Sequence, residues 1–83
     1  MLPTPETVRQ YIAQNLECEV LEVVGDGSHF EALIVSPAFE GKRLIARHQI
    51  VYAALGDSMK AEIHALSMRT LTPAEYQAEQ TNG

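Results

Sequence analysis

The beginning of the chain carries the apolar pattern of an amphipathic helix. Thr4-Pro5-Glu6 is typical of a helix start, with threonine as the N-cap, proline at the first helical position and an acid in the first turn. Apolar side chains then recur at the spacing of one helix face: Val8, Tyr11, Ile12 and Leu16. We therefore expect a helix over residues 5–16.

Two runs rich in β-branched and apolar residues follow, at residues 19–24 and 30–36. Between them lies Gly25-Asp26-Gly27-Ser28, a strong hairpin signal, because glycine readily adopts the positive φ angles of tight turns. Pro37 cannot donate to a strand ladder, so we expect it to end the second run. The pattern predicts two antiparallel strands joined by a short turn.

The helical period returns over residues 43–59, where one face carries Leu44, His48, Val51, Tyr52, Leu55 and Met59. A third strand is expected over residues 63–70. Thr72-Pro73-Ala74-Glu75 is a capping box, which predicts a short final helix, and residues 80–83 are expected to fray.

The predicted order is helix, strand, strand, helix, strand, helix. The second and third strands flank a helix, so they should run parallel through a right-handed crossover. The result is an α+β domain, αββαβα, with a three-stranded mixed sheet. We expect a single domain over residues 1–83, with an ordered core over about residues 5–76.

Composition narrows the functional classes. The chain has 83 residues and a formal net charge of −5, which disfavours non-specific attraction to nucleic acid or anionic membranes. A chain this small buries only about 60–65% of its unfolded surface, so a cleft enclosed by two lobes is not expected. The single cysteine cannot form an internal disulfide, and neither a signal peptide nor a membrane-spanning run is evident. We expect a cytoplasmic protein.

The topology makes a geometric prediction about the histidines. His29 begins the second strand and His64 begins the third, so both should lie at the sheet edge where the parallel strands start. Adjacent strands are about 5 Å apart, which would let the imidazoles converge on one metal ion. His48 lies early in the crossover helix, at the other end of the domain, and is excluded as a ligand. Cys18 is expected at that opposite edge too, in a structural role.

The residues alone leave the nature of this site open. A single histidine is more often a surface or packed residue than a ligand, and imidazole suits zinc, copper or iron. A [2Fe–2S] cluster needs four ligands, commonly thiolates, with a histidine pair as a known substitute on one iron. Two histidines cannot complete such a cluster, so a partner or a second copy of the chain would have to contribute ligands.

The runs GDGSHFEALIVSPAFEGKRLIARHQIVYAAL and IHALSMRTLTPAEY resemble the BolA family, and most closely its bacterial YrbA (also called IbaG) branch. The similarity spans roughly residues 5–76. It implies a fold similar to type II K-homology domains. It also implies a non-enzymatic partner of monothiol glutaredoxins, active in cluster trafficking or in iron, redox or acid-stress signalling in the bacterial cytoplasm.

In the heterocomplex that the resemblance implies, a [2Fe–2S] cluster is bound by the glutaredoxin cysteine, by glutathione and by the BolA-like chain. By motif, His64 in IHALSM matches the family's C-terminal ligand. His29 in DGSHF lies where members carry histidine or cysteine. No tightly bound cofactor is expected in the isolated chain, which should be a monomer or a weak homodimer.

The competing interpretation is a DNA-binding transcriptional regulator, as some family members are described. Lys42, Arg43 and Arg47 gather at the start of the crossover helix, where a helix N-terminus also favours anions. Against this, Gly41-Lys42-Arg43-Leu44 lacks the second glycine of the G-x-x-G loop of K-homology domains. For an enzyme we find no orienting acid beside Ser28-His29 and assign no catalytic residue.

Overall fold

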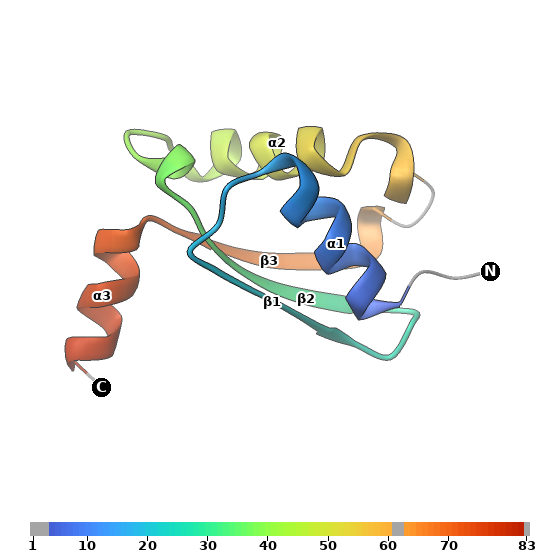
Figure 1. Ribbon diagram of the computed structural model, residues 1–83, viewed down its shortest axis with the longest axis horizontal. Coiled ribbons are helices and arrows are strands. Elements are labelled where there is room, and N and C mark those ends of the chain that lie inside the picture. Colours follow the sequence, from blue (N-terminus) through green and yellow to red (C-terminus); the bar gives the residue numbers. More distant parts are fainter. Residues whose placement is uncertain (1–3, 61–62, 83) are drawn as a thin grey trace.

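Helices cover one face of a three-stranded sheet in the computed structural model, which describes residues 4–60 and 63–82 (Figure 1). The elements are α1 (Pro5–Asn15), β1 (Val20–Gly25), β2 (Phe30–Val35), α2 (Leu44–Leu55), β3 (Leu66–Leu71) and α3 (Pro73–Asn82). The strand order is β1-β2-β3, with β1 antiparallel and β3 parallel to β2. The expected α+β fold and mixed sheet are confirmed.

The helix boundaries follow from local chemistry. The Thr4 hydroxyl accepts a hydrogen bond from the Thr7 N–H at 3.1 Å, which caps α1 as expected. α2 ends earlier than expected, because Gly56 adopts φ 58° and the chain continues as a 3₁₀ turn over Gly56–Met59. α3 reaches Asn82, well beyond the expected end of the core at residue 76, and Gly83 lies outside the described residues.

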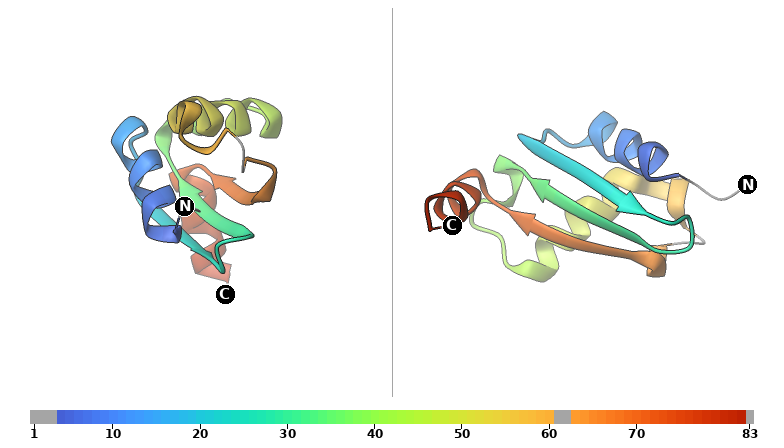
Figure 2. Two further views of the ribbon diagram at one scale, coloured as in Figure 1. Left: turned by 90° about the vertical axis from the view of Figure 1, so that its right-hand side faces the viewer. Right: turned by 90° about the horizontal axis from the view of Figure 1, so that it is seen from below.

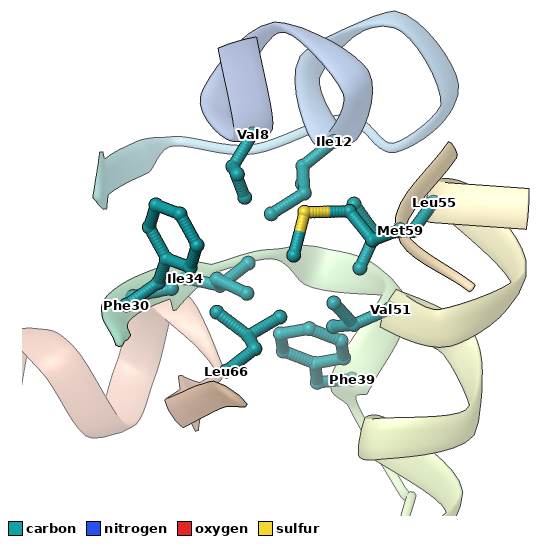
Figure 3. Packing of buried hydrophobic residues seen from close by; sticks show 10 residues of the cluster. Val8, Ile12, Phe30, Ile34, Phe39, Val51, Leu55, Met59 and Leu66 are labelled. Carbon is teal, nitrogen blue, oxygen red and sulfur yellow. The ribbon is translucent and has the colours of Figure 1, made fainter. Parts of the chain in front are cut away.

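The core lies between the sheet and the helix pair α1–α2. Val8 and Ile12 point down from α1, Phe30 and Ile34 rise from β2, and Val51 and Leu55 come from α2 (Figure 3). Two of the apolar residues expected on one face of α2 are exposed: Leu44 (63%) and Tyr52 (41%). Tyr52 follows Val51 by about 100° around the helix, so it lies on the flank when Val51 faces the sheet.

The other face of the sheet is open. Along β2 the side chains alternate, so Phe30, Ala32 and Ile34 face the helices while Glu31 lies exposed on the outer face. Seen from below, the strands lie in front of α1 and α2, and α3 lies at the far end from the β1–β2 hairpin (Figure 2). A shallow cavity of about 240 Å³ lies on this outer face, with Ser67 in its lining.

Arg47 joins α2 to the end of the sheet and to α3. Its guanidinium makes a two-pronged ion pair with Glu75, with Nη1–Oε1 at 2.7 Å and Nη2–Oε2 at 3.1 Å. Nη1 also donates to the Thr70 carbonyl at 3.0 Å. Glu75 in turn accepts the Thr72 N–H at 2.9 Å, which completes the predicted capping box. One carboxylate therefore caps α3 and attaches it to α2.

This network predicts an acid-dependent contribution to stability. The Arg47 guanidinium, and secondarily the Thr72 N–H, lower the pKa of Glu75 from 4.5 to about 2. Because the pKa is lower in the folded chain, the contribution is complete above about 4.5 and is lost as the pH falls towards 2. We expect Glu75→Gln to unfold at a lower urea concentration than wild type near neutral pH, and the difference to shrink on acidification.

Glu79→Gln is the matched control, because Glu79 forms an ion pair from the same helix but with Arg69, whose side chain is 62% exposed. Exposed pairs contribute little, so this variant should behave like wild type. A wild type–Glu75→Gln difference that stays constant down to about pH 2 would show that the charge of Glu75 does not carry the effect.

No helix within the described residues is long and apolar enough to span a membrane.

Candidate metal centre

The β1–β2 hairpin holds the backbone of His29 in place. The Asp26 carboxylate oxygen Oδ1 accepts hydrogen bonds from the N–H groups of Ser28 and His29, both at 3.0 Å, and from the Ser28 hydroxyl at 2.9 Å. The N–H of Ser28, its hydroxyl and the His29 N–H lower the pKa of Asp26, so the carboxylate is charged when it makes these bonds. The Asp26 N–H also donates to the His29 carbonyl at 3.2 Å. The turn therefore fixes the position of the His29 backbone, from which the imidazole side chain extends.

The His29 ring is exposed and reaches across to β3. Its Nε2 lies 3.4 Å from the Ser67 hydroxyl oxygen, within hydrogen-bonding distance. The sequence reasoning did not identify Ser67. The sequence carries no direct signal for it, because the register that pairs Glu31 with Ser67, and so puts Ser67 on the same face as His29, is set by the fold. The neighbour of the ring follows from strand register.

His64 lies beside β3 but not on it. We expected it at the start of a strand over residues 63–70, whereas the structure places it in a 3₁₀ turn, Ile63–Ala65, just before β3. Its side chain is exposed. Phe30 pairs with Leu66, so the residues before them, His29 and the His64 turn, share the hairpin end of the sheet as predicted. Convergence of the two imidazoles on one metal ion remains a prediction.

The donor set limits what this end of the sheet can bind. Among residues 4–60 and 63–82, no three side chains of His, Cys, Asp or Glu gather closely enough to hold a metal ion. Two exposed histidines fit a metal centre shared with a second molecule, because each can offer one nitrogen and the other ligands would come from outside. They do not provide the four ligands of a closed structural site.

Cys18 and His48 lie where the topology predicted, away from the hairpin end. Cys18 precedes β1, next to the pair Val20–Val35, and burial raises the pKa of its thiol. His48 is half-buried on α2 and packs edge-on against Tyr52, with ring centroids 6.4 Å apart. Its Nε2 is buried without a hydrogen-bond partner among the described residues. Neither side chain shares the end of the sheet with His29.

The basic residues at the start of α2 do not form one free patch. Lys42 and Arg43 are exposed, but the Arg47 side chain is only 13% exposed and pairs with Glu75. Its Nε also donates to the Lys42 carbonyl at 2.9 Å. The sequence prediction of three phosphate-binding side chains therefore reduces to two, because the third is committed to the contact between α2 and α3.

The chain is similar in sequence to known proteins. The family model described as BolA-like protein matches residues 12–75. The chain is 46% identical over 78 residues to Protein BOLA2 of Arabidopsis thaliana, which covers 88% of this chain and 83% of that protein. It is also 36% identical over 56 residues to the DNA-binding transcriptional regulator BolA of Escherichia coli, covering 68% of this chain and 53% of that protein.

Solved structures show the same architecture. A BolA protein homologue from Coxiella burnetii superposes with a TM-score of 0.76 at 43% identity, over 92% of this chain and 99% of that one. The solution structure of BolA1 from Mus musculus gives a TM-score of 0.78 at 33% identity, over 94% of this chain and 72% of that one. The fold is therefore shared with proteins of related sequence.

Proposed function

The chain belongs to the BolA-like family, and on that premise we propose that it is a non-enzymatic partner protein that shares a [2Fe–2S] cluster with a monothiol glutaredoxin. His64 and His29 bind the cluster from this chain, and the glutaredoxin cysteine and glutathione supply thiolates. The heterocomplex acts in cluster trafficking or in iron, redox or acid-stress signalling in the bacterial cytoplasm. Alone, the chain is a monomer or a weak homodimer without a tightly bound cofactor.

The parallel register of β2 and β3 carries the proposal. The pairing of Phe30 with Leu66 brings the segments that contain His29 and His64 to one end of the sheet, although they are far apart in sequence. Both side chains are exposed, so a second protein can reach them. A histidine pair is an accepted replacement for two thiolates in [2Fe–2S] centres, and two ligands are what this end of the sheet offers.

The residues of this chain have separable tasks in the heterocomplex. The cluster, when bound, supplies the transferable iron and sulfide. The Asp26 carboxylate accepts hydrogen bonds from the N–H groups of Ser28 and His29. These bonds stabilise the turn and keep His29 at the hairpin end of the sheet. His64 follows the crossover from α2 and enters β3 directly afterwards, so the sheet fixes its position along the strand axis.

The test is a titration of this protein into cluster-loaded monothiol glutaredoxin, followed by visible absorption and circular dichroism. Wild type is expected to give a new spectrum that saturates at an equimolar ratio. His64→Ala should abolish the new spectrum and His29→Ala should weaken its formation, because each removes an imidazole ligand. His48→Ala is the control, since His48 lies on α2 away from the hairpin end, and it should titrate like wild type.

An unchanged glutaredoxin spectrum with wild type would contradict the cluster function. Equal loss with His48→Ala, in variants that retain a wild-type far-ultraviolet spectrum, would contradict the assignment of ligands.

The second candidate function, regulation of transcription through DNA binding, is favoured by the name of the Escherichia coli relative. The exposed Lys42 and Arg43, at the start of a helix without a side-chain cap, could contact phosphates.

DNA binding is distinguished by its salt dependence, because each phosphate contact releases counterions. A DNA-binding function predicts that wild type binds duplex DNA at low salt and that added salt weakens this binding. The double variant Lys42→Ala/Arg43→Ala should then no longer bind the DNA. Arg47→Lys breaks the two-pronged pair with Glu75, so weakened binding in that variant would need a stability measurement beside it. Wild type that binds no DNA at low salt would exclude this candidate.

A further inference from the structure

Ser67 meets the His29 ring from the neighbouring strand. The register pairs Glu31 with Ser67, and side chains two apart along a strand share a face, so His29 and Ser67 both lie on the open outer face. The Ser67 side chain is exposed, so the core does not require its hydroxyl. Within the described residues, the partner of that hydroxyl is His29 Nε2, at 3.4 Å.

The chemistry of a neutral imidazole gives this contact a consequence. One ring nitrogen carries a proton and donates, while the other carries a lone pair that can bind a metal. In metal sites the nitrogen that does not bind the metal usually donates to a fixed acceptor, which sets the tautomer and the ring orientation. A serine hydroxyl oxygen has two lone pairs and can be that acceptor.

We propose that Ser67 is a positioning residue for His29: the Ser67 hydroxyl oxygen accepts a hydrogen bond from Nε2–H of His29, which leaves Nδ1 as the nitrogen that binds the metal. This inference rests on the proposed cluster function. The hairpin fixes the backbone end of the side chain through the Asp26 bonds to the His29 N–H and carbonyl, and Ser67 fixes the far end of the ring. Held at both ends, the imidazole loses less rotational freedom when a ligand arrives.

The first test needs no cluster. The imidazole ¹⁵N shifts of His29 are measured in the unloaded protein at mildly alkaline pH for wild type, Ser67→Ala and Ser67→Thr. We expect a higher fraction of the Nε2–H tautomer in wild type and in Ser67→Thr, which keeps a hydroxyl, than in an unstructured histidine peptide, which already favours Nε2–H. In Ser67→Ala the tautomer ratio should shift to that of an unstructured histidine peptide. Ser58→Ala, at an exposed serine in another part of the chain, should match wild type.

The second test uses the heterocomplex with cluster-loaded glutaredoxin. Loss of an outer partner of a metal ligand commonly costs about 10–100-fold in affinity, so Ser67→Ala should shorten the lifetime of the complex by about tenfold or more. Ser67→Thr should restore most of it. In a His29→Ala background, Ser67→Ala should have no additional effect, because the residue that it positions is absent.

The outcomes separate this inference from the proposed function. A dominant Nδ1–H tautomer in wild type, or an unchanged tautomer ratio in Ser67→Ala, would overturn the role of Ser67 even where the heterocomplex forms. An equal loss of complex lifetime from Ser67→Ala with and without His29 would also overturn it. If wild type leaves the glutaredoxin spectrum unchanged, the cluster function fails, and with it the role of Nδ1, while the tautomer result still decides the hydrogen bond.

Discussion

Phe30→Ala is expected to lower the free energy of unfolding by about 3–5 kcal/mol, the usual cost of truncating a buried phenylalanine. Phe30 is fully buried in the core between the sheet and α1–α2 (Figure 3). It also opens β2 and is paired on both sides, with Gly25 of β1 and Leu66 of β3. Domains are stable by only about 5–15 kcal/mol, so this loss should leave a substantial unfolded population.

Urea denaturation followed by circular dichroism measures this effect. Leu44→Ala is the control, because Leu44 is an apolar residue of similar size that is 63% exposed, and its truncation should change stability by no more than about 0.5 kcal/mol. A Phe30→Ala cost below about 1 kcal/mol would show that neighbouring side chains collapse into the space, against the close packing expected of a core. The variant should also bind cluster-loaded glutaredoxin weakly, since His29 directly precedes Phe30.

Gly25→Ala is expected to destabilise the domain by about 1–3 kcal/mol and to displace His29. A Cβ at this position would overlap the carbonyl oxygen of His29 and press on Phe30. The overlapping atom belongs to the backbone, so no side-chain rotation relieves it and the hairpin has to open. Because the Asp26 N–H donates to that same carbonyl, the movement should disturb the turn that holds the imidazole.

The comparison that isolates this effect is Gly41→Ala. Gly41 has φ 73°, but apart from its two chain neighbours no described residue comes within 4 Å of an added Cβ, so alanine costs only the left-handed backbone conformation, about 1–2 kcal/mol. Amide chemical shifts should therefore move at His29 and Ser67 in Gly25→Ala and stay in place in Gly41→Ala. Unmoved shifts at His29 in a folded Gly25→Ala protein would contradict the expected displacement.

Local patterns were sufficient for most of the architecture. The cap at Thr4, the turn at Gly25–Ser28 and the capping box at Thr72 each depend on neighbours within a few residues, so their outcome could be read from the chain itself. The crossover rule then gave a parallel pair and put His29 and His64 at one end of the sheet. That placement, which the proposed function depends on, required no knowledge of side-chain packing.

The rotation of each helix and the long-range contacts between side chains could not be predicted from the sequence. The period of α2 identified an apolar face but not which edge of it meets the sheet, so it did not determine that Tyr52 lies at the rim, 41% exposed. From the sequence, Arg47 would be an unpaired cation, but the fold places Glu75 beside it. His64 lies in a 3₁₀ turn before β3 and not on the strand. The contact between Ser67 and His29 joins two strands across the crossover.

The sequence alone determined the elements, their order and the shared end of the two histidines, because these follow from local hydrogen bonding and chain connectivity. Which side chains meet was decided only by the tertiary structure, because such contacts depend on how one element is turned against another.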